Sequence, residues 1–226
     1  MPFSALIPAA GSGIRMTAGG PKQYLPLAGR PMLWHAVRAL CVPRVESVFV
    51  VLAPDDQVFA THDWSEFGER VQPLYCGGET RRDSVYNGLV AAMAVLEADD
   101  WMLVHDAARP CLPAKDLDNL MSELEGDEVG GILALPAVDT VKKVSGNRIM
   151  STEERAQLWL AQTPQMFRAG LLAQALASAK GSPTDEAAAV EQLGLKPRVV
   201  AGSRENFKVT WPEDVAIAEA ILGRRA

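Results

Sequence analysis

A glycine-rich segment near the start of the chain combines residue types that bind phosphate. Residues 8–23 read PAAGSGIRMTAGGPKQ and directly follow the apolar run FSALI. The candidate ligands in this segment are Gly11, Gly13, Arg15 and Lys22. Successive glycines let backbone N–H groups turn toward an anion, while a guanidinium and an ammonium supply positive charge. Two cations beside such a backbone nest suit a triphosphate better than a monophosphate.

Two familiar phosphate-binding loops do not fit this segment. Met16 stands where a dinucleotide fingerprint requires its third glycine, and Gln23 follows the lysine where a P-loop requires serine or threonine. A flexible turn with solvated charges is the alternative. We favour a phosphate site because the segment follows the first predicted strand of an α/β pattern, where ligands bind at strand carboxyl ends.

Polar segments also follow four other predicted strands. They are GGETRRDS (77–84), HDAARP (105–110), TPQ (163–165) and NFKVT (206–210). Arg81 and Arg82 fall at a predicted helix N-terminus, where the helix dipole disfavours cations, so an anion is expected to offset that cost. Asp106 can hold Mg²⁺ or a hydroxyl, and Arg109 can hold a phosphate or polyol. We therefore predict that these segments share one edge of the sheet.

The elements that position these residues are short apolar runs alternating with helical patterns. Strands are predicted within 3–8, 45–54, 71–78, 101–104, 130–141, 158–167 and 196–202. Helices are predicted within 32–40, 80–96, 117–124, 168–180, 184–193 and 211–222. The helix at 80–96 begins with a capping box formed by Thr80 and Asp83. Repeated strand–helix units predict one α/β domain over residues 1–226, with a mostly parallel sheet covered by helices.

A polar, alternating segment interrupts this rhythm. Residues 142–154 read KKVSGNRIMSTEE, with a Ser-Gly-Asn turn at the centre, which predicts a β-hairpin. A polar arm of this kind, at about 137–158, either mediates dimerisation or forms a surface flap. The sequence alone leaves both possibilities open.

Composition excludes several function classes. The chain has 226 residues and a formal net charge of −6, so we do not expect nucleic acid, which would need a basic face, as a partner. We expect neither a signal peptide nor a membrane helix, because no apolar run is long enough. The three cysteines form no CxxC pair and the three histidines have no ligand spacing, so free thiols in the cytoplasm are expected and a zinc site is not.

Taken together, the motifs resemble a known enzyme family. The segments GGPKQ, GGETRRDSVYNGL, MLVHDAARP, PAVDTVK, TPQMF, TDEAAAVE and NFKVTWPED occur in this order along nearly the whole chain. They are similar to those of the 2-C-methyl-D-erythritol 4-phosphate cytidylyltransferases of non-mevalonate isoprenoid biosynthesis. The resemblance implies a Rossmann-like nucleotidyltransferase fold and a homodimer whose arms reach the neighbouring active site. It also implies transfer of CMP from CTP to the alcohol phosphate, with Mg²⁺ as cofactor and pyrophosphate as second product.

The resemblance also assigns roles to individual residues. The catalytic residues would be Arg15, Lys22 and Lys208. The nucleotide contacts would be Ala9, Ala10, Gly11, Gly13, Gly78, Glu79 and Ser84. The contacts to the polyol phosphate would be Asp106, Arg109, Thr140, Arg155 and Thr163, with Thr140 and Arg155 reaching the partner's substrate. Asp106 would also be the nearest metal ligand, although Mg²⁺ would be held mainly by the CTP phosphates.

Two other functions compete with this one. A cytidylyltransferase for ribitol 5-phosphate or a related pentitol phosphate would have similar CTP loops. A non-catalytic nucleotide-binding module would have lost the cationic set, yet Arg15, Lys22, Arg109 and Lys208 are all present. These cations fit a reaction in which one phosphate attacks another, because neutralising charge is then the main task.

Overall fold

A seven-stranded sheet forms the centre of the computed structural model, which describes residues 2–11 and 20–225. The strand order is β11-β7-β10-β6-β1-β4-β5. The strands are β1 (Phe3–Pro8), β4 (Val45–Val51), β5 (Val71–Leu74), β6 (Trp101–Val104), β7 (Gly130–Pro136), β10 (Trp159–Arg168) and β11 (Arg198–Ala201). All neighbouring pairs are parallel except those of β10, which runs antiparallel to both β6 and β7. The predicted α/β class with a mostly parallel mixed sheet is therefore confirmed.

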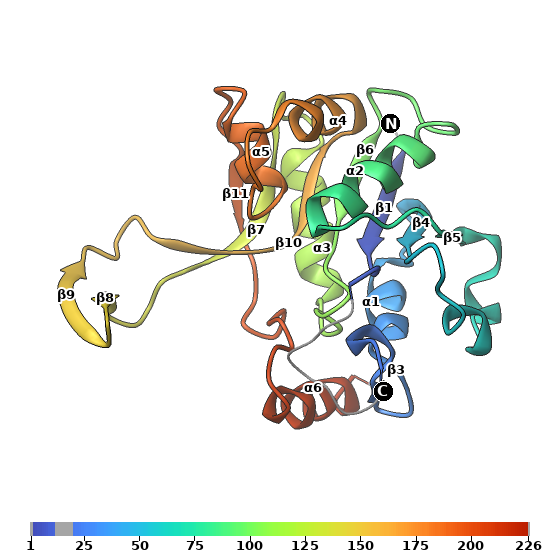
Figure 1. Cartoon of the computed structure of the whole chain (residues 1–226), viewed down its shortest axis with the longest axis horizontal. Helices are drawn as coiled ribbons and strands as arrows, with labels where there is room; N and C mark the ends of the chain where they lie inside the picture. The colour runs from blue at the N-terminus through green and yellow to red at the C-terminus, as the bar shows by residue number, and fades with distance from the viewer. Residues whose placement is uncertain (1, 12–19, 226) are drawn as a thin grey trace.

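Helices cover both faces of this sheet (Figure 1). They are α1 (Met32–Leu40), α2 (Arg81–Ala92), α3 (Ala114–Leu124), α4 (Ala169–Ser178), α5 (Glu186–Glu191) and α6 (Glu213–Gly223). Short 3₁₀ segments are η2 (Lys22–Tyr24), η3 (Phe59–Thr61) and η4 (Ser65–Arg70), the last of which is interrupted at Gly68. The capping box of α2 is present, since Thr80 and Asp83 each accept a hydrogen bond from the other's backbone N–H. None of the helices within the described ranges is long and apolar enough to cross a membrane.

The core is divided by the sheet into two apolar clusters. Side chains alternate along β1, so Ala5 and Ile7 face α1 and α3, whereas Leu6 faces α2 and α4. This alternation explains why the strand is apolar at nearly every position, because both faces are buried. A third, small cluster packs α6 against the loops below the sheet through Ala218 and Ile221. The loops at the strand ends are thus anchored by three apolar clusters.

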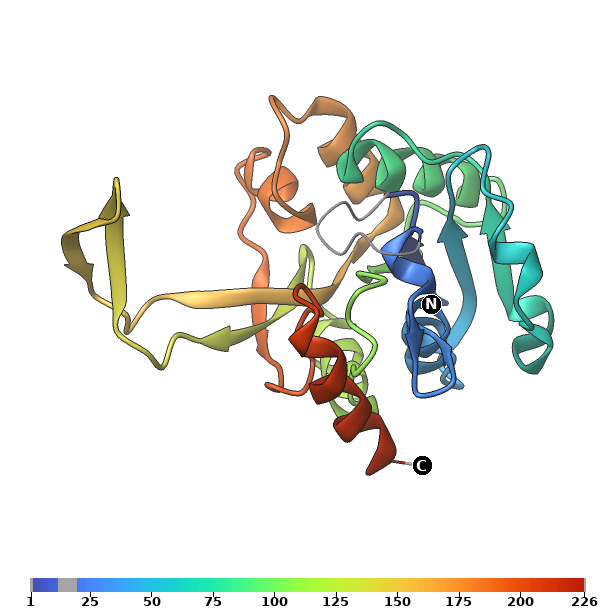
Figure 2. The same cartoon turned by 60° about the horizontal axis from the view of Figure 1, so that its bottom comes forward.

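The arm is a two-stranded hairpin that extends away from the body (Figure 2). It consists of β8 (Val141–Ser145) and β9 (Arg148–Glu153), paired antiparallel. Gly146 and Asn147 form its turn, both with positive φ (51° and 62°). The hairpin predicted from the Ser-Gly-Asn sequence is therefore present. A second short hairpin, β2 (Pro26–Leu27) and β3 (Arg30–Pro31), follows η2.

Several predicted boundaries were wrong. The strands expected through 54 and 78 end at Val51 and Leu74. The helix expected to reach Leu96 ends at Ala92, although Met93 and Leu96 still pack against the same core cluster. The strand expected through 141 ends at Pro136, although the Ala137 N–H still donates to the Leu158 carbonyl at 2.9 Å. Residues 163–165 do not end a strand but lie inside β10, because that strand runs antiparallel and continues to Arg168.

Candidate active site

A cavity of about 490 Å³ opens beyond the carboxyl ends of β1 and β6, where ligands bind in open α/β sheets. It is lined by Pro8, Ala9, Ala10, Gly11, Lys22, Gln23, Gly78, Glu79, Thr80, Arg81, Ser84, Asp106, Ala107, Ala108 and Lys208. These residues come from the loops after β1, β5 and β6, from the start of α2 and from the segment before α6. The predicted clustering of polar segments at one edge of the sheet is therefore observed for these loops.

The loops after β1 and β5 approach one another so closely that glycine is required. A Cβ built on Gly77 would lie 2.2 Å from the Ala10 Cβ and 2.8 Å from the Leu52 carbonyl oxygen. Next to it, the Gly78 backbone N–H donates to the Ser84 hydroxyl at 3.1 Å. A Cβ on Gly78 would meet Asp83 at 2.5 Å. Gly78 therefore presents backbone, with no side chain, to the cavity, and Gly77 allows the close approach of the two loops.

The turn that carries Lys22 is tied to the same wall. The buried Gln23 side chain donates from Nε2 to the Ala9 carbonyl at 2.6 Å. The Lys22 ammonium donates to the Val209 carbonyl, next to Lys208 in the chain. Tyr24, the next residue of the turn, donates from its hydroxyl to Asp56 at 2.7 Å. Lys22 is thereby placed near Lys208 although the two lysines are far apart in sequence.

Asp106 is the electrostatic centre of the cavity. Its Oδ1 lies 3.0 Å from Arg81 Nε, and its Oδ2 lies 2.8 Å from Lys208 Nζ and 3.7 Å from Arg109 Nε. Burial alone would raise the pKa of this carboxyl, but Arg81, Lys208 and Arg109 overcome that effect and hold its pKa well below the usual range. Asp106 therefore stays ionised and fixes the cations around it.

Arg81 is held by a second, more deeply buried carboxylate. Its two terminal nitrogens contact the Glu186 oxygens at 2.6 and 3.1 Å, and Glu186 is only 1% exposed. Burial lowers the pKa of the guanidinium, but Glu186 and Asp106 raise it well above its ordinary value. The sequence led us to expect a bound anion opposite Arg81. The protein itself supplies those anions, so that inference was incomplete.

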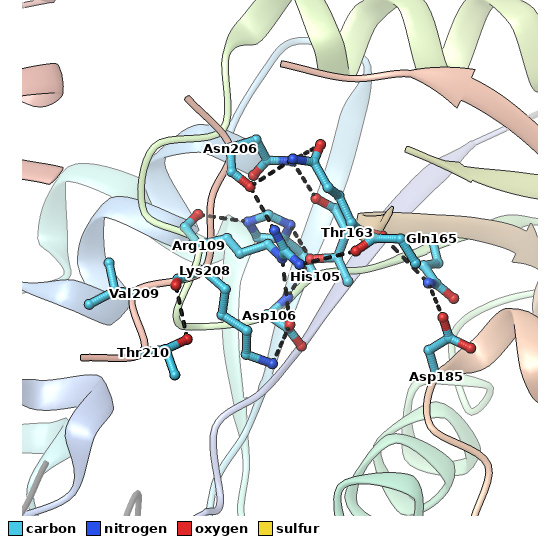
Figure 3. A network of polar contacts seen from close by, with 12 residues as sticks. His105, Asp106, Arg109, Thr163, Gln165, Asp185, Asn206, Lys208, Val209 and Thr210 are labelled. Carbon is cyan, nitrogen blue, oxygen red and sulfur yellow. Dashed lines mark hydrogen bonds and ion pairs between the residues drawn. The ribbon is translucent and has the colours of Figure 1, made fainter. Parts of the chain in front are cut away.

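A buried polar shell supports Asp106 from behind (Figure 3). The Asp106 N–H donates to Thr163 Oγ1 at 2.9 Å, and Thr163 Oγ1 lies 3.0 Å from His105 Nδ1. The other ring nitrogen of His105 lies 3.0 Å from the Arg109 carbonyl, which can only accept, so Nε2 carries the proton and Thr163 donates to Nδ1. Full burial lowers the pKa of His105 to about 4, which keeps the ring neutral. His105 is thus a structural neighbour.

Asn206 connects this shell to the segment of Lys208. It is fully buried, and its Nδ2 donates to the Thr163 carbonyl at 2.8 Å. The backbone carbonyl of Asn206 accepts a hydrogen bond from the Arg109 guanidinium at 2.7 Å. Through these bonds the loop after β6, the middle of β10 and the segment before α6 are fixed to one another.

The structure places the predicted site residues in four different settings. The cavity is lined by Ala9, Ala10, Gly11, Lys22, Gly78, Glu79, Ser84, Asp106 and Lys208. Arg109 and Thr163 lie behind Asp106, and their polar atoms bond mainly to the protein. Thr140 and Arg155 are exposed at the base of the arm and do not line the cavity. Gly13 and Arg15 lie outside the described residues.

The donor set does not form a protein-held metal site within the described parts of the chain. No group of three or more His, Cys, Asp or Glu side chains comes together there. Both oxygens of Asp106, the expected ligand, already contact Lys208 and Arg81. A role for Asp106 in binding Mg²⁺ therefore stays a prediction.

Sequence reasoning missed three supporting residues, namely Gln23, Glu186 and Asn206. Glu186 stands beside Asp185, whose capping bond to the Ala188 N–H explains one acidic residue at the start of α5 but not two. The extra carboxylate at the start of α5 and the two arginines at the start of α2 were the sequence features that could have indicated an ion pair between these helices. Gln23 and Asn206 were quoted within motifs, yet nothing in their spacing indicates their partners.

A mostly parallel α/β sheet with a cation-lined cavity at its strand ends defines a protein that binds a phosphorylated ligand. Comparison with known proteins identifies the family within this class. A sequence model of the IspD family, 2-C-methyl-D-erythritol 4-phosphate cytidylyltransferase, matches residues 3–224. The chain belongs to this family.

Individual relatives are similar over nearly their full length. A 2-C-methyl-D-erythritol 4-phosphate cytidylyltransferase from Nitrosospira multiformis is 56% identical over 225 residues, which cover 97% of each chain. One of the same name from Dechloromonas aromatica is 54% identical over 223 residues, covering 98% of this chain and 97% of the relative.

Solved structures of related enzymes have the same fold. A crystal structure of a 4-diphosphocytidyl-2C-methyl-D-erythritol synthase superposes with a TM-score of 0.86 at 37% identity and covers 98% of this chain and 99% of that one. The Francisella tularensis enzyme superposes with a TM-score of 0.81 at 33% identity and covers 98% of this chain and all (100%) of that one.

Proposed function

We propose that this protein transfers CMP from CTP to 2-C-methyl-D-erythritol 4-phosphate in isoprenoid biosynthesis. An oxygen of the alcohol's phosphate attacks the α-phosphorus of CTP, the bond to the β-phosphate bridging oxygen breaks, and pyrophosphate leaves with that electron pair. The product is a diphosphocytidyl alcohol. The observation that carries the proposal is the buried, ionised Asp106 holding Arg81 and Lys208 at the edge of a cavity that also contains Lys22. Membership of the family supplies the substrates.

The attacking group requires no general base in this chain. A phosphate monoester is largely ionised at neutral pH, so the main barrier is repulsion between two anions. Lys22 and Lys208 reach the cavity from separate segments and would bind the phosphates of CTP on either side of the reacting phosphorus. Their charges are oriented before substrate arrives, Lys208 by Asp106 and Lys22 by the Val209 carbonyl. Such preorganised charge is usually the largest contribution to catalysis. We assign Arg15 to the same phosphate set.

The nucleotide would lie along the backbone of the glycine-containing walls. Ala9, Ala10 and Gly11 line one wall, and Gly78, Glu79 and Ser84 line the other. Gly78 and Ser84 are bonded to one another, which fixes the backbone that we propose to contact cytosine. Gly13 belongs to the same nucleotide set. A divalent cation, Mg²⁺, would enter with the CTP phosphates and neutralise part of their charge.

The alcohol phosphate would bind where Asp106 and Lys208 meet. Asp106 suits the hydroxyl groups of the polyol, and Lys208 suits its phosphate. Arg109 and Thr163 would act mainly by holding Asp106 and its loop in place. Direct contacts from those two residues to substrate remain part of the proposal.

The arm would complete this site in a homodimer. Large apolar side chains are exposed along it and its base, at Val138, Val144, Ile149, Met150, Leu158, Trp159 and Leu160. Apolar side chains gathered on an extended arm favour burial against a second chain. Thr140 and Arg155 stand at the base of the arm and would contact the phosphate bound by the partner. We also place the enzyme in the cytoplasm, where its three free cysteines would stay reduced.

A paired-substrate assay tests the proposal. Purified protein with Mg²⁺ is given each nucleoside triphosphate in turn, together with 2-C-methyl-D-erythritol 4-phosphate or ribitol 5-phosphate, and pyrophosphate release is measured. We expect turnover with CTP and the methylerythritol phosphate, with a far lower kcat/KM for every other pair. Preference for ribitol 5-phosphate would contradict the assigned alcohol. Absence of pyrophosphate release with any alcohol phosphate would indicate a non-catalytic module.

A further inference from the structure

A second cavity of about 440 Å³ lies beside α1 and the end of α6. Within the described chain it shares no lining residue with the catalytic cavity. Its walls come from β3 and α1, from the segment after Arg109 and from the C-terminal end of α6. The volume falls within the range typical of small-molecule sites. The second cavity is not part of the catalytic site proposed above.

Three guanidinium groups from separate segments line this second cavity. Arg30 and Arg38 lie over the Trp34 ring, 5.3 and 5.4 Å from its centroid, and Arg225 comes from the end of α6. Arg225 is paired with Glu205. Across the ranges that the structure describes, Arg30 and Arg38 form no hydrogen bond or ion pair, although Asp63 interacts electrostatically with Arg30. Because no acidic residue of the described chain lines the cavity, its lining carries an excess of positive charge.

The remaining walls are apolar or neutral. Leu112 and Leu222 line the cavity with several smaller apolar residues. His35 also lines it, but burial lowers its pKa and its Nε2 is bonded to the Leu27 carbonyl at 2.7 Å. Trp34 contributes its ring to the same wall. The lining thus combines a cationic rim and an apolar surface.

We propose that this cavity binds a small organic phosphate whose apolar body lies against Leu112 and Leu222. Arg30 and Arg38 would hold the phosphate, since one guanidinium group can donate two parallel hydrogen bonds to phosphate oxygens. A phosphate monoester fits better than a carboxylate because it carries about −1.5 to −2 charges at neutral pH, which matches the two unpaired guanidinium groups. The proposal rests on this cavity alone and is independent of the reaction assigned to the other one.

Calorimetric titration with hexyl phosphate tests this site. The probe is titrated into the wild-type protein, into Arg30→Gln/Arg38→Gln and into the matched control Arg198→Gln/Arg204→Gln, which removes two exposed arginines elsewhere. Lys208→Gln separates this site from binding at the catalytic cavity. We expect binding to weaken about tenfold or more in Arg30→Gln/Arg38→Gln and to persist in the control and in Lys208→Gln.

Further titrations separate the contributions of charge and apolar surface. Inorganic phosphate and hexanol are each expected to bind about tenfold or more weakly than hexyl phosphate, because each lacks one half of the proposed ligand. Circular dichroism checks folding, and Arg38→Gln alone replaces the double variant if that variant is unfolded. The proposal would be overturned if wild type failed to bind, if Lys208→Gln alone lost binding, or if inorganic phosphate bound as tightly as hexyl phosphate.

Discussion

The catalytic cavity and the arm both carry predicted substrate contacts, but the chain holds those contacts in different ways. In the cavity, Asp106 is 8% exposed and has two cations within 3.0 Å. On the arm, Arg155 is exposed and donates to the Val138 carbonyl close by in sequence. The cavity is therefore arranged before substrate binds, whereas the arm residues would acquire their substrate contact only from a second chain.

The two regions therefore suit different steps of the reaction. Charges held in a buried network lose little freedom when the transition state forms, so they favour catalysis. An exposed side chain on an arm has that freedom still to lose, and so it is better suited to binding and to linking two subunits. Mutations in the cavity should therefore affect turnover and stability, and mutations on the arm should affect substrate affinity.

The largest effect is expected for Lys22→Ala. Removing one oriented positive charge should lower kcat by roughly 10²-fold to 10³-fold, as for other preorganised donors. Steady-state pyrophosphate release gives the number, and Lys115→Ala, an exposed lysine on α3, is the control. A near-normal kcat in a folded Lys22→Ala protein would remove Lys22 from the catalytic set.

Glu186→Gln should destabilise the protein strongly. It removes one carboxylate from a buried ion pair and leaves Arg81 partly uncompensated, at a cost of about 3 kcal/mol in the free energy of unfolding. Urea denaturation measures that free energy, with Glu191→Gln, an exposed position on the same helix, as the comparison. Equal stability of the two variants would mean that the Arg81–Glu186 contact does not support the cavity.

His105 predicts a pH dependence of stability. Its pKa is about 4 in the folded chain and about 6.5 when unfolded, so the unfolded chain binds more protons between these values. The contribution of neutral, buried His105 to the free energy of unfolding should therefore be complete above about pH 6.5. It should decrease as the pH drops toward about 4. His105→Gln should lose less stability than wild type between about pH 7 and about pH 5. Parallel losses in urea denaturation would contradict a buried neutral histidine.

A smaller effect is expected on the arm. Arg155→Ala should raise KM for the alcohol phosphate by about tenfold, with little change in KM for CTP, because one phosphate contact is lost. The neighbouring Arg148→Ala, at the start of β9, controls for loss of charge on the arm. A selective rise in KM for CTP would place Arg155 at the nucleotide.

The sequence predicted those features that depend on local pattern. Apolar runs predicted the strands, the Thr80–Asp83 pair predicted the start of α2, and Ser-Gly-Asn predicted the hairpin turn. It also placed Lys22, Asp106 and Lys208 in one site, through motif order and family resemblance.

The remainder depends on contacts that no local pattern records. Arg81 and Glu186 are 105 residues apart, so their pairing follows only once α2 and α5 are packed. The antiparallel direction of β10 likewise arises because the chain leaves the body through the arm and returns. Thr163 consequently sits within a strand, although its sequence resembles a strand end.

Mixing two variants that are each impaired at low alcohol phosphate tests most directly whether cavity and arm form one site from two chains. Lys22→Ala and Arg155→Ala proteins are dissociated together, reassociated in equal amounts and assayed at low alcohol phosphate. Half of the dimers would be mixed, and each mixed dimer would have one site with neither defect, so activity should recover to about a quarter of wild type. Activity no higher than the mean of the two separate variants would contradict an arm that serves its neighbour.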